Sequence, residues 1–198
     1  IQNRGTITTP TGGQVYLLAP DVENSGLINS PKGEVLLAAG YSIRLVDSTN
    51  PNIAVVVSAP ENEAINLGTL VSQSGTIGIY GGLISQKGIV SADSASVGKN
   101  GKIVFRATGN VNVEAGSVTS ADGPSGGKIT IDSGGSTVLT GGSVSAVGTE
   151  LKGGNIKVLG EKVELTGDTV LDAAGYTGGG SVLAGGSFQG RDPAVRNA

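Results

Sequence analysis

The stretch Gly101-Lys-Ile-Val-Phe105 decides how the rest of the chain is interpreted, because its pattern recurs in Gly127-Lys-Ile-Thr-Ile131 and in Gly154-Asn-Ile-Lys-Val158. In each copy, apolar residues stand at the second and fourth positions after the glycine. This two-residue period is that of a strand with one buried face. This start occurs seven times along the chain, at intervals that are almost equal from the third copy onward. A nearly constant period of this kind indicates a repeat architecture built from strands. The glycines are Gly13, Gly33, Gly75, Gly101, Gly127, Gly154 and Gly180.

A second marker lies ahead of these glycines: a glycine, an apolar residue two places on, and a small residue two further, as in Gly5-Thr-Ile-Thr-Thr9. Its apolar positions keep the same period, and the long interval between Gly33 and Gly75 indicates one coil without a marker. A third strand lies between the two markers at Val111/Val113, Thr137/Leu139 and Val163/Leu165. Three short strands in each coil of about 20–27 residues predict an all-β fold, a parallel β-helix of about eight coils. The apolar positions are Ile7, Ile28, Leu70, Val90, Val118 and Val144.

The alternation then predicts which side chains fill the interior, provided that the seven glycines are in register. One buried column is Val15, Val35, Ile77, Ile103, Ile129, Ile156 and Val182. The next is Leu17, Leu37, Ile79, Phe105, Ile131, Val158 and Ala184. The residues between them point outward and include Gln14, Lys102, Arg106, Lys128, Asp132, Asn155 and Lys157.

The composition suits a narrow interior and excludes several classes of protein. The chain has 35 glycines, six aromatic residues, and no Trp, Cys, Met or His. Glycine at this level without a Gly-X-Y period excludes collagen, and the regular apolar columns argue against disorder. The formal net charge is −3 and the 13 Lys and Arg residues are dispersed, which argues against a nucleic-acid partner. No apolar run approaches the roughly 18 residues of a membrane span.

The segment from Tyr41 to Leu67 breaks the period. Its apolar runs, Ile43–Asp47 and Ile53–Val57, flank a turn rich in Asn and Pro. This chemistry favours a hairpin near residues 43–57 that leaves the helix before the chain returns at Gly68. The alternative is a plain pair of coils without the glycine marker.

Two long motifs carry a family resemblance. The run Gly12-Gly-Gln-Val-Tyr-Leu-Leu-Ala-Pro-Asp-Val-Glu-Asn-Ser-Gly-Leu-Ile-Asn-Ser-Pro-Lys-Gly-Glu-Val-Leu-Leu-Ala-Ala-Gly40 and the closing Gly179–Ala198 resemble the filamentous haemagglutinin family of two-partner-secreted exoproteins. The resemblance implies a right-handed parallel β-helix, export through a dedicated outer-membrane partner pore, and a role at the cell surface, often as an adhesin.

One departure from the family concerns the secretion signal. The family's secretion domain carries Asn-Pro-Asn-Leu and Asn-Pro-Asn-Gly-Ile motifs, and here Asn50-Pro-Asn-Ile53 comes close in a different context. We interpret it as a turn and expect the chain to follow or end the secretion module. The chain begins in mid-period without Met, so we expect residues 1–198 to be a single β-helix segment of a longer exoprotein.

A polysaccharide-active enzyme is the main alternative, since parallel β-helices also host lyases and hydrolases. Such enzymes need carboxylates or basic residues clustered on one outer face. Asp132 with Arg106 or Lys157 is the candidate group, although opposite charges on neighbouring strands also decorate ordinary solvated sheets. Without His or paired carboxylates at matching positions, we predict no catalytic residue.

Metal and cofactor sites are also not predicted. The Gly-Gly pairs lack the Asp that follows them in calcium-binding β-rolls. The outward Tyr16 and Tyr80 are candidates for stacking on a sugar ring. The sequence therefore predicts a non-catalytic, secreted β-helical scaffold of a surface adhesin, with a host-cell or carbohydrate receptor as a candidate partner. A self-assembling filament subunit, joined end to end through open sheet edges, stays as a further alternative.

Overall fold

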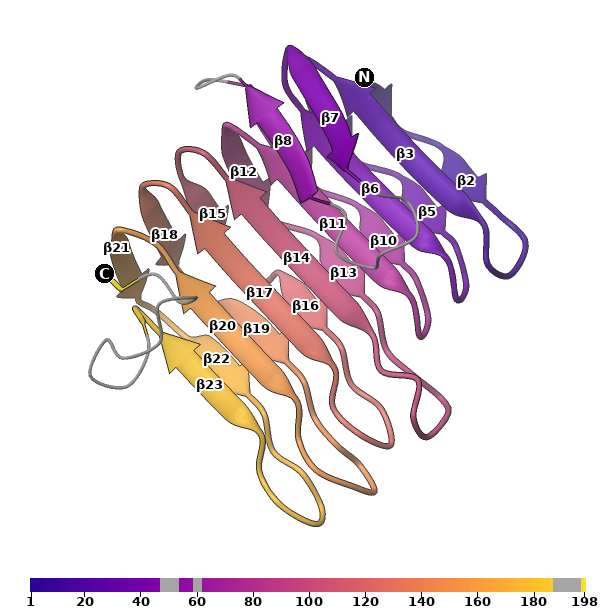
Figure 1. Ribbon diagram of the computed structural model, residues 1–198, viewed down its shortest axis with the longest axis vertical. Coiled ribbons are helices and arrows are strands. Elements are labelled where there is room, and N and C mark those ends of the chain that lie inside the picture. Colours follow the sequence, from indigo (N-terminus) through magenta and orange to yellow (C-terminus); the bar gives the residue numbers. More distant parts are fainter. Residues whose placement is uncertain (47–53, 59–61, 187–196) are drawn as a thin grey trace.

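The computed structural model describes residues 1–46, 54–58, 62–186 and 197–198, and for 43–46 and 54–58 it describes the backbone only. The fold is a parallel β-helix with three sheets of seven strands each, and the described part contains no α-helix. Figure 1 shows the coils stacked side by side from the N-terminal to the C-terminal end. The predicted fold class is confirmed. No helix among the described residues is long and apolar enough to cross a membrane.

Each coil contributes one strand to each sheet in turn. Sheet A contains β1 (Gln2–Asn3), β4 (Val22–Asn24), β9 (Glu63–Asn66), β12 (Leu83–Gln86), β15 (Val111–Val113), β18 (Ser136–Leu139) and β21 (Lys162–Leu165). Sheet B contains β2 (Thr6–Thr8), β5 (Leu27–Asn29), β10 (Thr69–Val71), β13 (Ile89–Ser91), β16 (Val118–Ser120), β19 (Gly142–Ser145) and β22 (Thr169–Asp172). Sheet C contains β3 (Gln14–Ala19), β6 (Glu34–Ala39), β11 (Thr76–Gly81), β14 (Lys102–Ala107), β17 (Lys128–Ser133), β20 (Asn155–Leu159) and β23 (Ser181–Ala184).

The described strands form seven coils, one fewer than the expected number of about eight. Thr76 pairs directly with Glu34, which means that the long interval between Gly33 and Gly75 holds one coil and an insertion instead of two coils. The insertion is the predicted hairpin: β7 (Ser42–Val46) pairs antiparallel with β8 (Ala54–Ser58). The hairpin prediction is confirmed. The Asn50–Ile53 turn lies outside the described residues.

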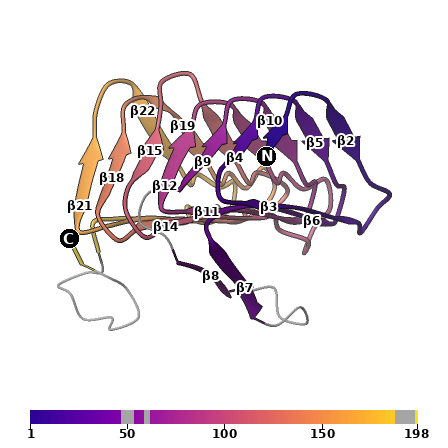
Figure 2. The ribbon, with the colours of Figure 1, turned by 90° about the horizontal axis from the view of Figure 1, so that it is seen from above.

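The hairpin leaves the helix after β6 and folds back onto sheet C. Figure 2 shows β7 and β8 beneath the flat layer that contains β3, β6, β11 and β14. The backbone of β8 lies against β6 and β11. One part of the outer face of sheet C is therefore covered by the chain's own insertion.

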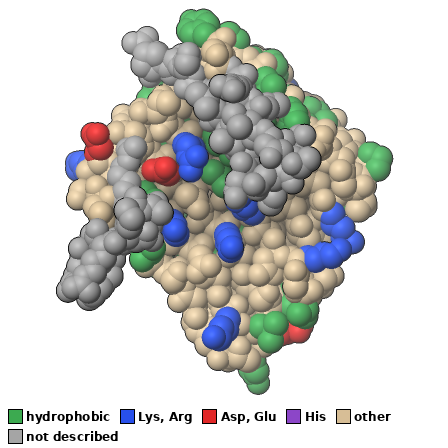
Figure 3. All heavy atoms as spheres, in the orientation of Figure 1, with side chains coloured by type: hydrophobic (Ala, Val, Ile, Leu, Met, Phe, Trp, Pro, Cys, Tyr) green, Lys and Arg blue, Asp and Glu red, His purple; other side chains and the backbone are tan. Residues whose placement is uncertain are grey.

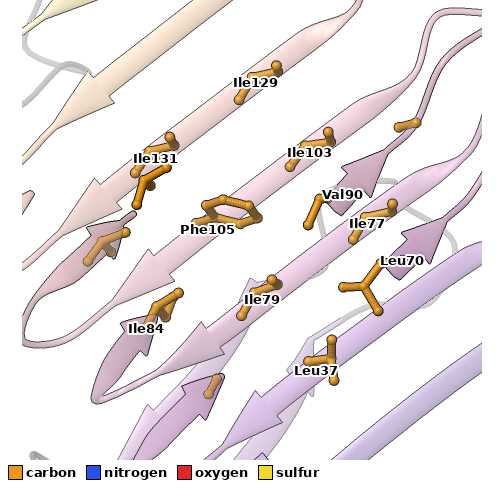
Figure 4. Close-up of a cluster of buried hydrophobic side chains, with 14 of the residues drawn as sticks. Leu37, Leu70, Ile77, Ile79, Ile84, Val90, Ile103, Phe105, Ile129 and Ile131 are labelled. Carbon is orange, nitrogen blue, oxygen red and sulfur yellow. The ribbon is translucent and has the colours of Figure 1, made fainter. Parts of the chain in front are cut away.

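The interior follows the predicted columns. Ile77, Ile103, Ile129 and Ile156 are in register on successive strands of sheet C and are fully buried. Figure 4 shows Ile79, Phe105 and Ile131 forming the next row along the same strands. Both predicted columns are confirmed in register, although Val182 in the last coil is 42% exposed because no described coil follows it.

In one coil of sheet B the apolar residue of the second marker is not the residue that is buried. Val90 pairs with Thr119, and Thr119 pairs with Val144, so Thr119 and not Val118 is the buried residue at this position. The corner before β16 contains Gly116 with a positive φ of 79° and is longer than the corner that precedes Val90. The longer corner shifts the alternation by one residue. The expected small residue of this coil shifts with it, from Ser120 to the buried Ala121.

The repeated glycines are required by close approach between coils. At Gly33, which does not have a positive φ, an added Cβ would lie 2.0 Å from the carbonyl oxygen of Gly13 in the preceding coil. A side chain at this corner would force the stacked coils apart. The repeated glycine therefore marks the positions where the backbones of successive coils stack in close contact.

Candidate functional site

The outer face of sheet C is the candidate functional surface, and it divides into two parts. Toward the N-terminal end, the outward side chains of Leu36, Ala38, Tyr80 and Val104 are buried and form a second apolar cluster, against which Tyr16 and Leu18 pack. Because β8 lies over β6 and β11, the hairpin covers this cluster. These outward positions therefore add a second hydrophobic layer outside the helix interior.

The prediction that Tyr80 stacks on a sugar ring is wrong, because its side chain is only 6% exposed. Tyr16 is half-buried, and its hydroxyl donates a hydrogen bond to Glu34 Oε2 at 2.5 Å. Partial burial, followed by the hydrogen bond and the charge of Glu34, raises the pKa of Tyr16 well above its usual value. Both rings are therefore part of the apolar layer on the outer face of sheet C. The signal that sequence reasoning missed is the set of apolar outward residues on β3, β6, β11 and β14, near the hairpin.

Toward the C-terminal end, the same face is cationic. Lys102 and Arg106 on β14, Lys128 on β17 and Lys157 on β20 occupy outward positions, as predicted. Lys102 and Lys128 are opposite each other in the register. Figure 3 shows blue Lys and Arg side chains spread over this face, with few red acidic groups among them.

The residues proposed for an enzymatic site are only partly brought together. Arg106 pairs with Asp132 in the register, and the distance from Nε to Oδ2 is 3.6 Å. Lys157 is opposite Thr130, so it is offset by two positions from Asp132. The residues that flank Asp132 in the register are Arg106 and Leu159, and neither is a second carboxylate. This arrangement does not provide the pair of carboxylates on which glycoside hydrolysis depends.

Side-chain amides form a buried ladder at the corner between sheets A and B. Asn3, Asn24, Asn66 and Gln86 are stacked in four successive coils, and each amide nitrogen donates to the amide oxygen of the next coil at 2.7, 2.9 and 3.0 Å. Asn24, Asn66 and Gln86 also donate to backbone carbonyls two positions on. The ladder satisfies buried polar groups and fixes the coil register.

At the corner between sheets B and C, carboxylates connect successive coils by hydrogen bonds. Asp93 accepts hydrogen bonds from the Ser91 and Ser120 hydroxyls and from the Asp122 backbone N–H. Asp122 repeats the pattern one coil later with the Ser145 hydroxyl and the Val147 N–H. Burial raises the pKa of Asp122, and the nearby Asp93 and Asp172 act in the same direction.

These carboxylates do not form a metal site. Within the described ranges, no three His, Cys, Asp or Glu side chains gather in a group that could hold a metal ion. The backbone and hydroxyl partners of Asp93 and Asp122 instead show that both groups hold loops between successive coils.

Comparison with known proteins finds similarity among solved structures. The chain matches no protein-family model and no curated protein sequence. Among solved structures, it is similar to the crystal structure of the HMW1 secretion domain from Haemophilus influenzae, with a TM-score of 0.75 and 30% sequence identity. The match covers 91% of this chain and 59% of that chain. The chain therefore spans somewhat more than half of the length of that secretion-domain chain.

Proposed function

We propose that this chain is a β-helical segment of an exoprotein exported by two-partner secretion. The observation that carries the proposal is the similarity to the HMW1 secretion domain over 91% of the chain, at 30% identity. The family resemblance of the Gly12–Gly40 and Gly179–Ala198 motifs points in the same direction. The inferred partner during export is an outer-membrane pore, and the inferred destination is the cell exterior.

The function that we assign after export is mechanical. Each coil adds one strand spacing, about 4.8 Å, to the length of the helix, so stacked coils make a stiff extension of a surface protein. Such a scaffold displays or forms an adhesive surface of a haemagglutinin-like adhesin and needs no catalytic residue. Asp132 supports this assignment, because its nearest ionic partner is Arg106 and no second carboxylate stands in register beside it.

Export is tested by placing the chain behind a cleavable signal peptide and the N-terminal part of a two-partner secretion domain in a Gram-negative host, with or without the outer-membrane pore that recognises that domain. We expect the chain in the medium only when the pore is present, and in the periplasm otherwise. Lys162→Ala, a change at a fully exposed side chain, is the matched control and should be exported like the parent. Retention of both proteins in the periplasm when the pore is present would refute the proposal.

A further inference from the structure

The cationic part of sheet C contains a hollow that the export function does not use. Its volume is about 610 Å³, and it extends across β14, β17, β20 and the start of β23. Its polar lining is Lys102, Lys128, Thr130, Asn155, Lys157 and Ser181. The size falls within the range of small-molecule sites in proteins.

The lining offers hydrogen-bond donors almost exclusively. Three ammonium groups and the Thr130 hydroxyl face the hollow, and no carboxylate is among its lining residues. The Ser181 hydroxyl donates to Asn155 Oδ1 at 2.7 Å, so the oxygen of this amide is engaged and its nitrogen is left as a donor. A site of this kind suits a ligand that supplies negative charge and several acceptors.

Two of the three lysines lie close enough on neighbouring strands to repel each other. Lys102 and Lys128 are directly opposite on neighbouring strands, where like charges are destabilising. Partial burial lowers the pKa of Lys102, and the charges of Lys128 and Arg106 lower it further. By contrast, on sheet A Lys162 lies 2.8 Å from Glu164, and Lys87 lies 3.0 Å from Glu114 just beyond the ends of β12 and β15. Neither Lys128 nor Lys157 has an acidic partner of this kind within the described residues.

We propose that this hollow binds the phosphate monoester of a phosphorylated sugar. A phosphate dianion would offset the repulsion between Lys102 and Lys128 and would also attract Lys157, since lysines act as point charges toward its oxygens. The hollow is larger than a phosphate group, and its other polar lining residues, Thr130, Asn155 and Ser181, offer hydrogen-bond partners for sugar hydroxyls. The site lies on the part of sheet C that the hairpin leaves open, and the proposal does not depend on the route of export.

The test is a calorimetric titration of the chain at low ionic strength with glucose 6-phosphate, inorganic phosphate and glucuronate. We expect glucose 6-phosphate to bind most tightly. Lys128→Ala and Lys157→Ala should each weaken it about tenfold, the loss expected for one hydrogen bond to a charged group. Lys162→Ala removes the same charge from sheet A and should leave the affinity unchanged.

Stability separates a binding defect from a folding defect. Without ligand, Lys128→Ala should melt at the same temperature as the parent or higher, because it removes the repulsion with Lys102. The phosphorylated sugar should raise the melting temperature of the parent more than that of the variant at the same ligand concentration. Equal affinity of parent and both lysine variants would overturn the proposal. If glucuronate binds as tightly as glucose 6-phosphate, the assignment to a phosphate group is overturned. If inorganic phosphate binds as tightly as glucose 6-phosphate, the proposed contribution of the sugar is overturned.

Discussion

The coils before Ser91 and the coils after it have the same interior but different corners. In residues 1–90, the chain turns from sheet B to sheet C in tight corners such as Ser30–Gly33, and buried amides pin the opposite corner. In residues 91–186 the corresponding corners are longer loops, and apolar Val113 and Leu139 replace the amides in the register. Asp93 and Asp122 hold these loops instead.

The outer face of sheet C differs in the same way. The hairpin covers an apolar cluster in the first half, whereas the second half exposes lysines. The comparison shows that the interior requires only apolar side chains at the right period. The corners and the outer face differ between the two halves without changing that interior. Any function that is specific to this chain therefore belongs to those variable parts.

The largest expected effect concerns the shared interior. Phe105→Ala should destabilise the chain by about 3–5 kcal/mol, and Leu37→Ala in the first half by about 2–5 kcal/mol, because both side chains are fully buried. Urea unfolding followed by circular dichroism measures both. A large effect at one position and a negligible effect at the other would show that the interior is not equivalent in the two halves.

The next effect is specific to the first half. Asn66→Ala removes the middle of the amide ladder and leaves the Gln86 Oε1 atom without its donor, so we expect a loss of about 2–3 kcal/mol. Gln2→Ala is the matched control, since this amide is exposed on the same sheet, and it should cost less than about 0.5 kcal/mol. Equal unfolding midpoints for Asn66→Ala and the parent would mean that the ladder does not stabilise the first half.

A smaller effect, of opposite sign, is expected in the second half. The Thr119 hydroxyl is buried without a hydrogen-bond partner, so Thr119→Val should stabilise the chain by about 1 kcal/mol. Thr137 is equally buried, but its hydroxyl donates to the Leu159 carbonyl at 2.7 Å, so Thr137→Val should destabilise it by a similar amount. Thermal unfolding of the two variants distinguishes them, and shifts in the same direction would contradict the shifted register at Thr119.

The smallest effect depends on pH. Since the pKa of Asp122 is raised in the folded chain, its ionised form opposes folding, and stability should rise as the pH falls through that pKa toward the ordinary value of 3.8. Asp122→Asn removes the charge and should stabilise the chain at pH 7 by less than about 1 kcal/mol, because the site is partly solvated. This advantage should shrink as the pH is lowered toward 4. A variant that loses stability at pH 7 would show that the carboxylate charge is needed for the loop.

Much of the fold could be predicted from the sequence because glycine spacing and alternation report directly on coil stacking. Ile103, Ile129 and Ile156 fall in one column because each follows its glycine at the same distance. The second marker does not identify the buried residue at Val118, because a longer corner changes the alternation there. Between Gly33 and Gly75 the hairpin was predicted, but the interval was also counted as an additional coil, because interval length alone does not separate a coil from an insertion.

The candidate site was less predictable. The sequence placed Lys102, Lys128 and Lys157 on the outer face, but the hollow depends on which strands the hairpin leaves uncovered. Tyr80 was misassigned for the same reason, since alternation separates inward from outward positions and does not tell which outward positions another segment covers.

Residue-resolved native-state hydrogen exchange tests most directly whether the halves share one interior and differ at their corners. Four corner amides have similar backbone hydrogen bonds of 2.8–3.0 Å: Gly68 and Gly88 in the first half, and Thr149 and Tyr176 in the second. We expect Leu37 and Ile131 to exchange only through global unfolding, Gly68 and Gly88 to be nearly as slow, and Thr149 and Tyr176 to exchange through local opening of exposed loops. Different protection at Leu37 and Ile131, or equal protection at all four corner amides, would contradict this division.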